Sequence, residues 1–583
     1  MSSSALSLEV PAAFGVARSF SGRRWRLAVA SDEAVRAMAR EAEIPLVLAQ
    51  LLVARGMSAA DLAPTLKQLL PDPSVFKDMD RAVARVKAAI EAGEKVAVFG
   101  DYDVDGSCSA ALLHDVFGAF GIRPRLYIPD RMTEGYGPSA QAFRTLKDEG
   151  VSLAITVDCG ATAVDALGAA QAMGLDVIVL DHHAVEHAPP AFAQVNPNRA
   201  GDTSGQGQLA AVGVTFLFAV ALNRALRDSR AVPDLFATLD LVALATICDV
   251  VPLTGVNRAL VRAGLAQLAK LERPGLAALA EVAGASAPFT PYHCGYVFGP
   301  RINAGGRVGR CSLGVDLLTT RDPAKARDYA LALDLHNRER QAIEKTILDE
   351  AIAFAHTQDN VPFLFTAKEG WHPGVVGIVA GRLKDRFGKP SFVAGFEGGM
   401  GRGSARSVAG VDIGAVMRAA KVAGVIESGG GHAMAAGFSL QAHQADAFHA
   451  FLAKSFADGI PAGALDLSID ALVSPSGATE GLLRDVAHAG PFGAGNPEPV
   501  FALSDVRVVF ADIVGQDHVK LRLEGGGARL DAIAFRCADQ PLGKGLLASR
   551  GRTIHAAGRL KTDAWNGRVR VQLHLDDAAP AGA

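Results

Sequence analysis

The segment Val98-Phe-Gly-Asp101-Tyr-Asp103-Val-Asp105-Gly-Ser107 carries the clearest structural signal in this chain. It places three aspartates at alternate positions where a short apolar run gives way to a helical pattern, and alternate residues of an extended chain point to the same side. Three neighbouring carboxylates repel one another unless a cation lies among them. The alternative interpretation is an acidic helix N-cap, which needs only one aspartate.

Short apolar runs alternate with amphipathic segments from Lys95 onward, a pattern typical of a parallel sheet covered by helices. The predicted strands are Val96–Phe99, Leu126–Ile128, Leu153–Val157 and Val177–Leu180. Three of these runs lead into an aspartate, namely Asp101, Asp158 and Asp181. Ligands bind at the carboxyl ends of strands in open parallel sheets, so we expect these acids to converge in one crevice.

Two further segments carry residue types that bind metals. His182 and His183 follow Asp181, and imidazoles beside carboxylates are a common mixture of metal ligands, although a lone histidine is usually structural. Asp249 stands within an apolar run that begins at Leu241. A buried, unpaired carboxylate is costly, which favours a metal partner for Asp249.

Length, charge and cysteine content limit the class of protein. A chain of 583 residues is long enough for three or four domains. Its six cysteines lack any C-x-x-C pair, which argues against a disulfide framework and a zinc–thiolate site. A net charge of −3 excludes a global electrostatic attraction to nucleic acid, so any such site must be local. Neither a signal-peptide pattern nor a membrane-spanning apolar run is found, so we expect a cytoplasmic protein that does not bind membranes.

The remaining patterns predict how the chain is organised. Residues 325–355 have the pattern of one long helix, residues 360–455 mix short strands with glycine-rich turns, and the tail alternates polar and apolar residues. Asn566-Gly567 is expected to form a hairpin turn in that tail. We therefore predict an α/β protein with an N-terminal accessory segment (1–75), a parallel-sheet domain (76–324), a connecting helix (325–357), a smaller α/β domain (358–460) and a β-barrel (461–583).

The acidic segments resemble those of the DHH phosphoesterase superfamily. The matching segments are Asp101-Tyr-Asp103-Val-Asp105-Gly106, Val157-Asp158-Cys-Gly160, Asp181-His182-His183 and Asp249. The resemblance implies two divalent ions, Mn²⁺ or Mg²⁺, whose ligands are Asp101, Asp103, Asp105, Asp158, His182 and Asp249. It further implies that Asp158 bridges both ions, that Asp103 serves one ion, and that Asp105, His182 and Asp249 serve the other. Two such ions can activate water and neutralise the charge of a phosphodiester.

One position departs from the family pattern. Many members carry a histidine four residues before the middle aspartate, where this chain has Phe99. Either Asp101 compensates for the missing imidazole, or the first ion binds more loosely. His183 also has two interpretations, because it can orient or protonate a reacting oxygen or can instead hold a metal ligand in place.

Several other segments resemble the RecJ exonucleases within that superfamily. They include Tyr127-Ile-Pro-Asp-Arg131-Met-Thr-Glu-Gly-Tyr136-Gly, Gly299-Pro-Arg301-Ile-Asn303-Ala-Gly-Gly-Arg307 and Trp371-His372-Pro-Gly-Val-Val-Gly377. Guanidinium groups form fork-like hydrogen bonds with phosphate, and a tyrosine ring can stack on a base. Substrate contacts are therefore predicted for Arg131, Tyr136, Arg301, Asn303 and Arg307. The alternative for each arginine is a solvated surface charge.

The smaller α/β domain resembles the DHHA1 domain that accompanies DHH domains. Its glycine-rich segments are Gly403-Ser404-Ala405-Arg406-Ser407 and Gly429-Gly-Gly-His432. Glycines allow backbone amides to approach a phosphate closely. Ser404, Arg406 and His432 are predicted to bind substrate. The predicted catalytic residues are His183, Asp158, His432 and Arg406.

The tail resembles an oligonucleotide-binding (OB) barrel. Such barrels hold single strands in basic grooves, and the predicted basic residues are Lys520, Arg522, Arg568 and Arg570. A solvated strand face is the alternative. Pro491–Phe501, at the entry to the barrel, also resembles RecJ but has the composition of a plain linker.

Together, these resemblances imply an exonuclease that degrades single-stranded DNA from 5′ to 3′, releases mononucleotides and acts in DNA repair and recombination. Its expected partners are single-stranded DNA, a single-strand-binding protein and a helicase, and the chain is expected to be monomeric. One alternative is a phosphodiesterase of the same superfamily that acts on nanoRNA or cyclic dinucleotides. The other is an inactive single-strand-binding replication factor, whose expected mark is an incomplete set of metal ligands.

Overall fold

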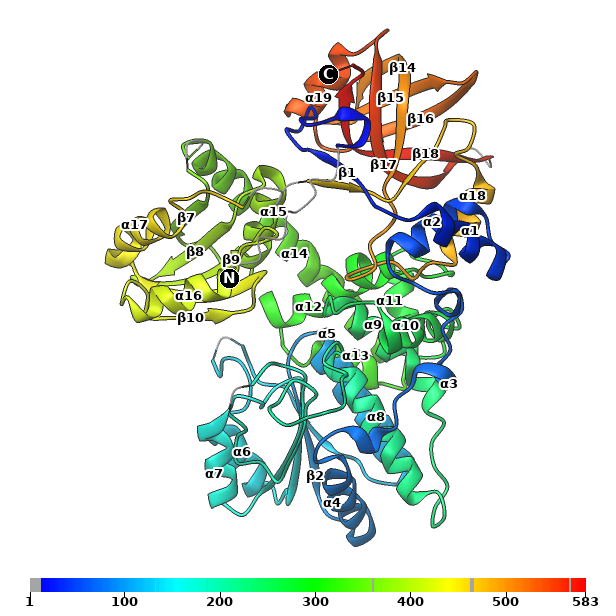
Figure 1. Cartoon of the computed structure of the whole chain (residues 1–583). Coiled ribbons are helices and arrows are strands. Elements are labelled where there is room, and N and C mark those ends of the chain that lie inside the picture. The colour runs from blue at the N-terminus through cyan, green and yellow to red at the C-terminus, as the bar shows by residue number, and fades with distance from the viewer. Residues whose placement is uncertain are drawn as a thin grey trace, which may run out of the picture. The chain divides into compact units, whose positions relative to one another are not determined.

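Two compact units make up the chain. The computed structural model describes residues 12–131, 133–185, 187–358, 361–461, 466–565 and 568–582. The parallel-sheet unit contains Pro64–Thr346 and Pro491–Pro497, and the barrel unit contains Met1–Ala63, Ile347–Gly490 and Glu498–Ala583. Helix α14 (Pro323–His356), predicted as one long helix, begins in the first unit and ends in the second (Figure 1). The predicted α/β class is confirmed.

A five-stranded parallel sheet, in the order β3-β2-β4-β5-β6, forms the centre of the parallel-sheet unit. Its strands are β2 (Val96–Gly100), β3 (Arg125–Tyr127), β4 (Leu153–Val157), β5 (Asp176–Leu180) and β6 (Ala193–Val195). The four strands predicted from apolar runs are confirmed. The fifth, β6, has only three residues, which is too short for a distinctive pattern.

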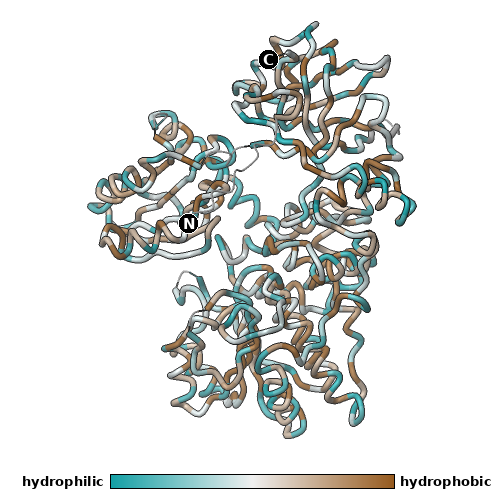
Figure 2. Tube along the Cα trace, in the orientation of Figure 1, coloured by the Kyte–Doolittle hydropathy of each residue, from teal (hydrophilic) through white to brown (hydrophobic). Residues whose placement is uncertain are grey.

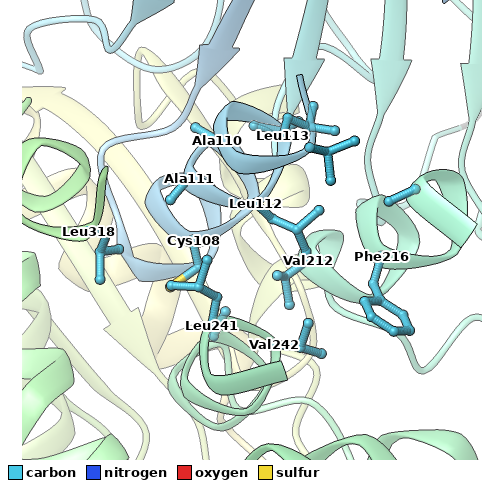
Figure 3. Packing of buried hydrophobic residues seen from close by; sticks show 14 of the residues in the cluster. Cys108, Ala110, Ala111, Leu112, Leu113, Val212, Phe216, Leu241, Val242 and Leu318 are labelled. Atoms are coloured by element: carbon cyan, nitrogen blue, oxygen red, sulfur yellow. The ribbon is translucent and has the colours of Figure 1, made fainter. Parts of the chain in front are cut away.

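Helices cover both faces of this sheet because alternate strand residues point in opposite directions. Val98 and Ile155 belong to a hydrophobic cluster with α4 (Met79–Ala92), α5 (Val104–Ala119) and α8 (Ala211–Leu226). Phe99 and Ala154 belong to a second cluster with α6 (Ala140–Asp148) and α7 (Val164–Ala172). Figure 3 shows side chains of α5 gathered with those of α8 and α9.

The rest of the parallel-sheet unit is helical. Its elements are α3 (Leu66–Leu69), the 3₁₀ turn η4 (Leu235–Thr238), α9 (Leu239–Cys248), α10 (Gly255–Leu268), α11 (Pro274–Val282), the π-helix η5 (His293–Phe298), α12 (Gly299–Val308) and α13 (Leu313–Thr319). Among the described residues of the whole chain, no helix combines the length and apolar character needed to cross a lipid bilayer.

The barrel unit contains a second sheet, in the order β10-β11-β9-β8-β7, which is antiparallel except for the β7–β8 pair. Its strands are β7 (Leu364–Glu369), β8 (Ser391–Glu397), β9 (Met400–Arg406), β10 (Ser428–Gly431) and β11 (Ala435–Gln441). The helices of this part are α15 (Val376–Phe387), α16 (Ile413–Val422) and α17 (Ala445–Ser455).

The tail forms a closed five-stranded barrel, as its alternating pattern predicts. The strands are β14 (Phe501–Val514), β15 (His518–Gly525), β16 (Ala528–Ala534), β17 (Thr553–Trp565) and β18 (Arg568–Pro580), and the β14–β17 pairing closes the ring. Accompanying elements are β12 (Leu467–Ile469), β13 (Ala471–Leu472), α18 (Glu480–Ala487) and α19 (Pro541–Ala548). Figure 2 shows hydrophobic and hydrophilic residues mixed along these strands. The Asn566-Gly567 turn lies outside the described residues.

The N-terminal segment packs against the barrel. It contains β1 (Trp25–Leu27), α1 (Asp32–Glu41) and α2 (Leu46–Ala54), and β1 pairs in parallel with β12. The indole nitrogen of Trp25 donates a 2.9 Å hydrogen bond to the Asp577 carboxylate, and both side chains are fully buried. This segment therefore contributes to the core of the barrel unit.

A buried arginine joins three helices of the parallel-sheet unit. Arg273, just before α11, forms ion pairs of 2.9 Å with Asp115 of α5 and 3.1 Å with Asp240 of α9, and it also donates to the carbonyl oxygen of Leu318 at 2.9 Å. All three charged side chains are largely buried. Because α5 and α9 also carry Asp105 and lead to Asp249, this cluster fixes two helices that supply predicted metal ligands.

Replacing Arg273 with leucine should lower the free energy of unfolding of the parallel-sheet unit by about 3–5 kcal/mol, because buried Asp240 would lose its ion pair with Arg273 and Asp115 would keep only the exposed Arg321. Arg321→Leu is the matched control: Arg321 pairs with the same Asp115 but is 61% exposed, so its loss should cost at most about 1 kcal/mol. Urea unfolding followed by circular dichroism measures both changes. Equal losses from the two variants would contradict this account.

Candidate metal centre

Three acids meet at one edge of the parallel sheet because their strands are in register. Gly100 lies opposite Val157, and Val157 lies opposite Leu180. The next residues along these strands are Asp101, Asp158 and Asp181. Asp249, which ends α9, completes the acidic edge through its contacts with His182.

Asp103 and Asp105 have structural partners as well. Asp103 is the N-cap of α5, where its carboxylate accepts a 3.0 Å hydrogen bond from the Gly106 amide. Asp105 is buried, and its two oxygens accept hydrogen bonds of 2.7 and 2.9 Å from the amides of Ala211 and Val212 at the start of α8. The N-cap interpretation therefore holds for Asp103 alone, and it leaves the convergence of the other acids unexplained.

All six predicted metal ligands belong to tight groups of potential ligand atoms. Within each group the atoms lie within 4.8 Å of one another, and the groups are Asp101, Asp103 and Asp158; Asp105, His182 and Asp249; and Asp158, Asp181, His182 and His183. Asp158 belongs to the first and third groups, and His182 belongs to the second and third. Asp158 is therefore next to both predicted ion sites, as a bridging ligand must be.

Four buried polar atoms at this centre have no hydrogen-bond partner among the described residues. They are Asp101 Oδ1, Asp158 Oδ1, His182 Nε2 and Asp249 Oδ2. His182 Nε2 lies 3.5 Å from both Asp158 Oδ1 and Asp249 Oδ2. Such atoms are costly to bury without partners, and oxygen and imidazole atoms are the ligands that Mn²⁺ and Mg²⁺ accept. The residues present therefore fit a pair of divalent cations.

Burial and mutual repulsion act strongly on these acids. Burial and then the charge of Asp103 raise the pKa values of Asp101 and Asp158 well above the usual range, and raise the pKa of Asp105 to about 7. Burial and the charge of Asp105 raise the pKa of Asp249 to about 9. Burial lowers the pKa of His182 to about 4, which leaves its imidazole neutral and able to bind a cation.

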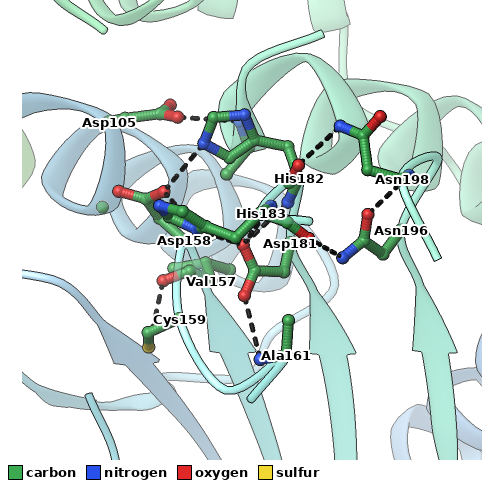
Figure 4. A network of polar contacts seen from close by, with 12 residues as sticks. Asp105, Val157, Asp158, Cys159, Ala161, Asp181, His182, His183, Asn196 and Asn198 are labelled. Atoms are coloured by element: carbon green, nitrogen blue, oxygen red, sulfur yellow. Dashed lines mark hydrogen bonds and ion pairs between the residues drawn. The ribbon is translucent and has the colours of Figure 1, made fainter. Parts of the chain in front are cut away.

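Asp181 positions the His-His pair rather than remaining unpaired. Its carboxylate accepts hydrogen bonds from the backbone amides of His182 and His183 and from the Ala161 amide, and lies 2.8 Å from His183 Nδ1 (Figure 4). Burial alone would raise the pKa of Asp181, but the His183 hydrogen bond and charge hold it below its usual value. Burial opposes the charge on His183, yet Asp181 raises the pKa of His183 to about 9.

Two asparagines fix the backbone of this pair. Asn198 donates a 2.6 Å hydrogen bond to the His182 carbonyl oxygen, and Asn196 donates a 2.8 Å hydrogen bond to that of His183 (Figure 4). Neither asparagine is predicted from the sequence, and the positioning role of Asp181 is not predicted either. Of these three residues, only Asp181 could have been identified from the sequence as positioning the His-His pair, because it directly precedes the two histidines.

Left-handed backbone occurs at one of the acids and directly after another. Asp158 has φ of +59°, and Val250, directly after Asp249, has φ of +61°. Aspartate tolerates the left-handed region, but a β-branched residue adopts it at a cost that surrounding contacts must offset.

The segment Pro491–Pro497 supplies such contacts close to Val250. The Leu253 amide donates a 2.7 Å hydrogen bond to the Ala494 carbonyl oxygen, and a Cβ atom at Gly495 would lie 2.8 Å from Pro252 Cβ. The glycine permits this close approach. The segment is therefore bound to the loop after Asp249, and the plain-linker interpretation is wrong.

Phe99, at the position where the superfamily resemblance leads us to expect histidine, is part of the core. Its fully buried ring stacks on Tyr127, with ring centroids 5.1 Å apart, and contacts Phe143. It offers no ligand atom. Asp101, two residues later, lies in the group with Asp103 and Asp158, which is the arrangement expected if Asp101 compensates.

The predicted substrate residues of this unit have different surroundings. The Arg131 guanidinium lies 5.2 Å from the Tyr102 ring centre, and burial lowers the pKa of the nearby Arg307 to about 10. The Tyr136 hydroxyl donates to the Asp158 carbonyl oxygen at 3.2 Å, while its ring contacts His183 edge-on. Arg301 instead pairs with Asp334 at 3.0 Å. The Oδ1 atom of Asn303 is buried and lacks a hydrogen-bond partner among the described residues.

The predicted phosphate-binding residues of the barrel unit lie on a strand of its open sheet or directly after one. Ser404 and Arg406 are on β9, where Arg406 donates to the Ser404 hydroxyl at 2.8 Å, and burial lowers the pKa of Arg406. His432 follows β10 and is exposed. A Cβ atom at Gly377 would lie 3.0 Å from Ser404 Oγ, so this glycine allows close packing around the pair.

Family models match three parts of the chain. The DHH family N-terminal domain matches residues 95–246, the DHHA1 domain matches residues 360–458, and the RecJ OB domain matches residues 469–577. The first match contains all the predicted metal ligands except Asp249.

Curated relatives and solved structures extend the match to most of the chain. The single-stranded-DNA-specific exonuclease RecJ of Bacillus subtilis is 35% identical over 95% of this chain and 71% of its own length, and that of Escherichia coli is 34% identical over 92% and 96%. The structure of RecJ from Thermus thermophilus in complex with Mn²⁺ matches with a TM-score of 0.82 and 29% identity over 96% of this chain and 80% of that one. A structure of exonuclease RecJ bound to manganese matches with a TM-score of 0.57 and 32% identity over 67% and 98%. The register of the acidic strands and these matches together show that the chain belongs to the RecJ family.

Proposed function

We propose that this chain is an exonuclease that hydrolyses single-stranded DNA with two divalent ions, Mn²⁺ or Mg²⁺. The proposal rests on the convergence of four buried ligand atoms that have no hydrogen-bond partner in the part of the chain that the structure describes. Asp101, Asp103 and Asp158 would hold one ion, and Asp105, His182 and Asp249 would hold the other, with Asp158 between them. Two bound ions would supply an activated water and neutralise the charge on the phosphodiester.

The surrounding side chains would orient the substrate. The Asp181 carboxylate contacts Nδ1 of His183, so the Nε2 atom of that ring would be the one to hydrogen-bond a phosphate or a reacting oxygen. Arg131 and Arg307 would bind phosphate, and the exposed Tyr136 ring would stack on a base. Arg301 and Asn303 stay predicted substrate residues, although the Arg301 guanidinium already donates to Asp334 at 3.0 Å and to the Val297 carbonyl oxygen at 2.8 Å.

Single-stranded DNA is the proposed substrate because relatives that match over more than nine-tenths of the chain are single-stranded-DNA-specific exonucleases. We propose 5′-to-3′ polarity, mononucleotide products and a cytoplasmic role in DNA repair and recombination. A single-strand-binding protein and a helicase are the proposed partners of a monomeric enzyme. The complete ligand set disfavours an inactive replication factor, and the barrel disfavours a phosphodiesterase for nanoRNA or cyclic dinucleotides.

Each part of the chain has a proposed role. Residues 76–324 would hold the metal ions, and residues 358–460 would bind phosphate through Ser404, Arg406 and His432. Residues 325–357 would connect these two parts. Residues 461–583 would bind the strand. Residues 1–75 would be an accessory segment, whose part up to Ala63 would brace the barrel. The barrel has a cavity of about 450 Å³ between α18 and strands β15, β16 and β18, lined by Arg522, Arg529 and Arg570. Arg522 is partly neutralised by Asp531 at 2.8 Å, and Arg529 lies 3.5 Å from Glu524.

Asp158→Asn should lower strand cleavage by about 10³-fold or more and reduce the number of bound Mn²⁺ ions, because the shared ligand would be lost. Asparagine suits the left-handed backbone at this position better than alanine does. In chelator, the variant should melt no lower than the unaltered protein, since one repelling buried carboxylate is removed. Asp165→Asn, an exposed change in α7, is the control. Activity within tenfold of the unaltered protein would refute the assignment.

His432→Ala and Arg406→Ala should each reduce turnover by more than about tenfold while leaving bound metal unchanged, because Arg406 is on β9, His432 follows β10, and neither is among the ligand groups. Steady-state rates and metal analysis of the same preparations separate the two effects. Arg402→Ala, an exposed change on β9, is the matched control. Loss of metal from either variant would contradict the division between the two units.

Replacing Arg529 and Arg570 with glutamate should weaken binding of long single strands and reduce the dependence of log Kd on log salt by about 0.7 for each phosphate that the barrel no longer neutralises. Substitution is a cleaner test than removal of residues 464–583, because removal would expose Trp25 and β1. Arg507→Glu, an exposed barrel change outside the cavity, is the control. An unchanged salt dependence would make the barrel a structural brace.

A further inference from the structure

Two tyrosines in the segment that packs against the end of α9 have most of their surface in solvent. Tyr292 precedes the π-helix η5 and Tyr296 lies within it, and they are 62% and 74% exposed. Their rings stack on each other, with centroids 5.4 Å apart and planes 24° apart. The pair therefore presents a flat aromatic surface that the described part of the fold leaves uncovered.

Other residues of this segment anchor it to the core. Phe289 and Phe298 are buried and contact each other edge-on with centroids 5.3 Å apart. Cys294 is also buried, and its carbonyl oxygen accepts a hydrogen bond from the Cys248 thiol at 3.3 Å. The fold of η5 is thus stabilised without the two tyrosine rings. π-Helices are rare in proteins, and many of those known are at functional sites. The presence of η5 therefore favours a binding role for the two exposed rings.

The tyrosine segment packs against the end of α9 that leads into a metal ligand. The Cys248–Cys294 hydrogen bond joins it to the residue before Asp249, and a Cβ atom at Gly295 would lie 3.6 Å from Ile247 Cγ2. Val250, directly after Asp249, is 68% exposed. The segment that carries Tyr292 and Tyr296 is therefore fixed to the end of α9 that leads into Asp249.

We propose that Tyr292 and Tyr296 form a stacking platform for an unpaired nucleobase of the strand whose phosphate lies at the metal centre. This inference rests on the proposed function. An aromatic face binds any base through stacking, whereas a base inside a duplex has both faces covered by its neighbours. The platform would thus favour single strands without reading their sequence. It is separate from Tyr136, which contacts Asp158 and His183 instead of the α9 end.

The test compares Tyr292→Ala/Tyr296→Ala with Tyr292→Phe/Tyr296→Phe, which keeps both rings. The alanine pair should raise KM for an oligothymidylate strand by about fivefold or more with kcat changed less than twofold, and the phenylalanine pair should restore KM. Phe236→Ala is the matched control, because Phe236 is 63% exposed on η4, at the opposite end of α9. Melting temperature and bound Mn²⁺ should stay unchanged in all variants.

Abasic strands identify the occupant. In the unaltered enzyme, one abasic nucleotide placed at successive positions should raise KM at one or two positions near the cleaved end. The alanine pair should show no further rise at those positions, because the stacking partner is already absent. If the alanine pair has the same KM as the unaltered enzyme, the proposal is overturned. It is also overturned if the alanine pair raises KM as much on a fully abasic strand as on the normal strand, because the rings would then contact something other than a base or have a structural role.

The two proposals fail in distinguishable ways. If the unaltered enzyme cleaves strands and the alanine pair behaves identically, the platform is wrong and the nuclease function stands. If the unaltered chain cleaves no strand, the proposed function is wrong. Fluorescence binding of the same strands then tests the platform alone, where equal affinity of the alanine pair would overturn it.

Discussion

Several carboxylates cannot share a small buried volume unless something offsets their repulsion, and this constraint governs the parallel-sheet unit. The amides at the start of α8 stabilise Asp105, and three backbone amides with His183 stabilise Asp181. Asp101, Asp158 and Asp249 each keep a buried oxygen that has no such partner within the described residues. The protein therefore satisfies some of its acids internally and leaves others for cations. Strand register, the Arg273 cluster and the Pro491–Pro497 segment all keep these acids together against their repulsion.

Much of this arrangement was predictable because it depends on local patterns. An apolar run followed by aspartate marks a strand and its carboxyl end, so the order of residues alone places Asp101 and Asp158 at one sheet edge. Asp249 was predictable from the cost of an acid within an apolar run. The barrel followed from polar–apolar alternation, which is a period of two residues. In each case the physical cause lies within a few residues of the feature.

Features that depend on distant partners could not be predicted. Nothing near Asp105 indicates that its oxygens would accept hydrogen bonds from Ala211 and Val212, and nothing near Trp25 indicates a buried bond to Asp577. The sequence shows Phe99 as a missing ligand, but only the structure shows its ring inside an aromatic cluster. Tyr292 and Tyr296 were also missed, because a π-helix has no pattern that separates it from an α-helix over six residues.

The attachment of Pro491–Pro497 to the loop after Asp249 has a consequence for how such enzymes can be recombined. The segment lies next to the barrel in sequence, yet it belongs to the parallel-sheet unit in space. A chimera that takes its C-terminal part from a relative would therefore exchange one half of a contact whose other half, Pro252–Leu253, stays behind. Exchange would be tolerated best with a junction after Pro497, or when the two halves come from the same parent. The segments of this chain that can be exchanged as a unit are therefore set by their contacts in space and not by their order in the sequence.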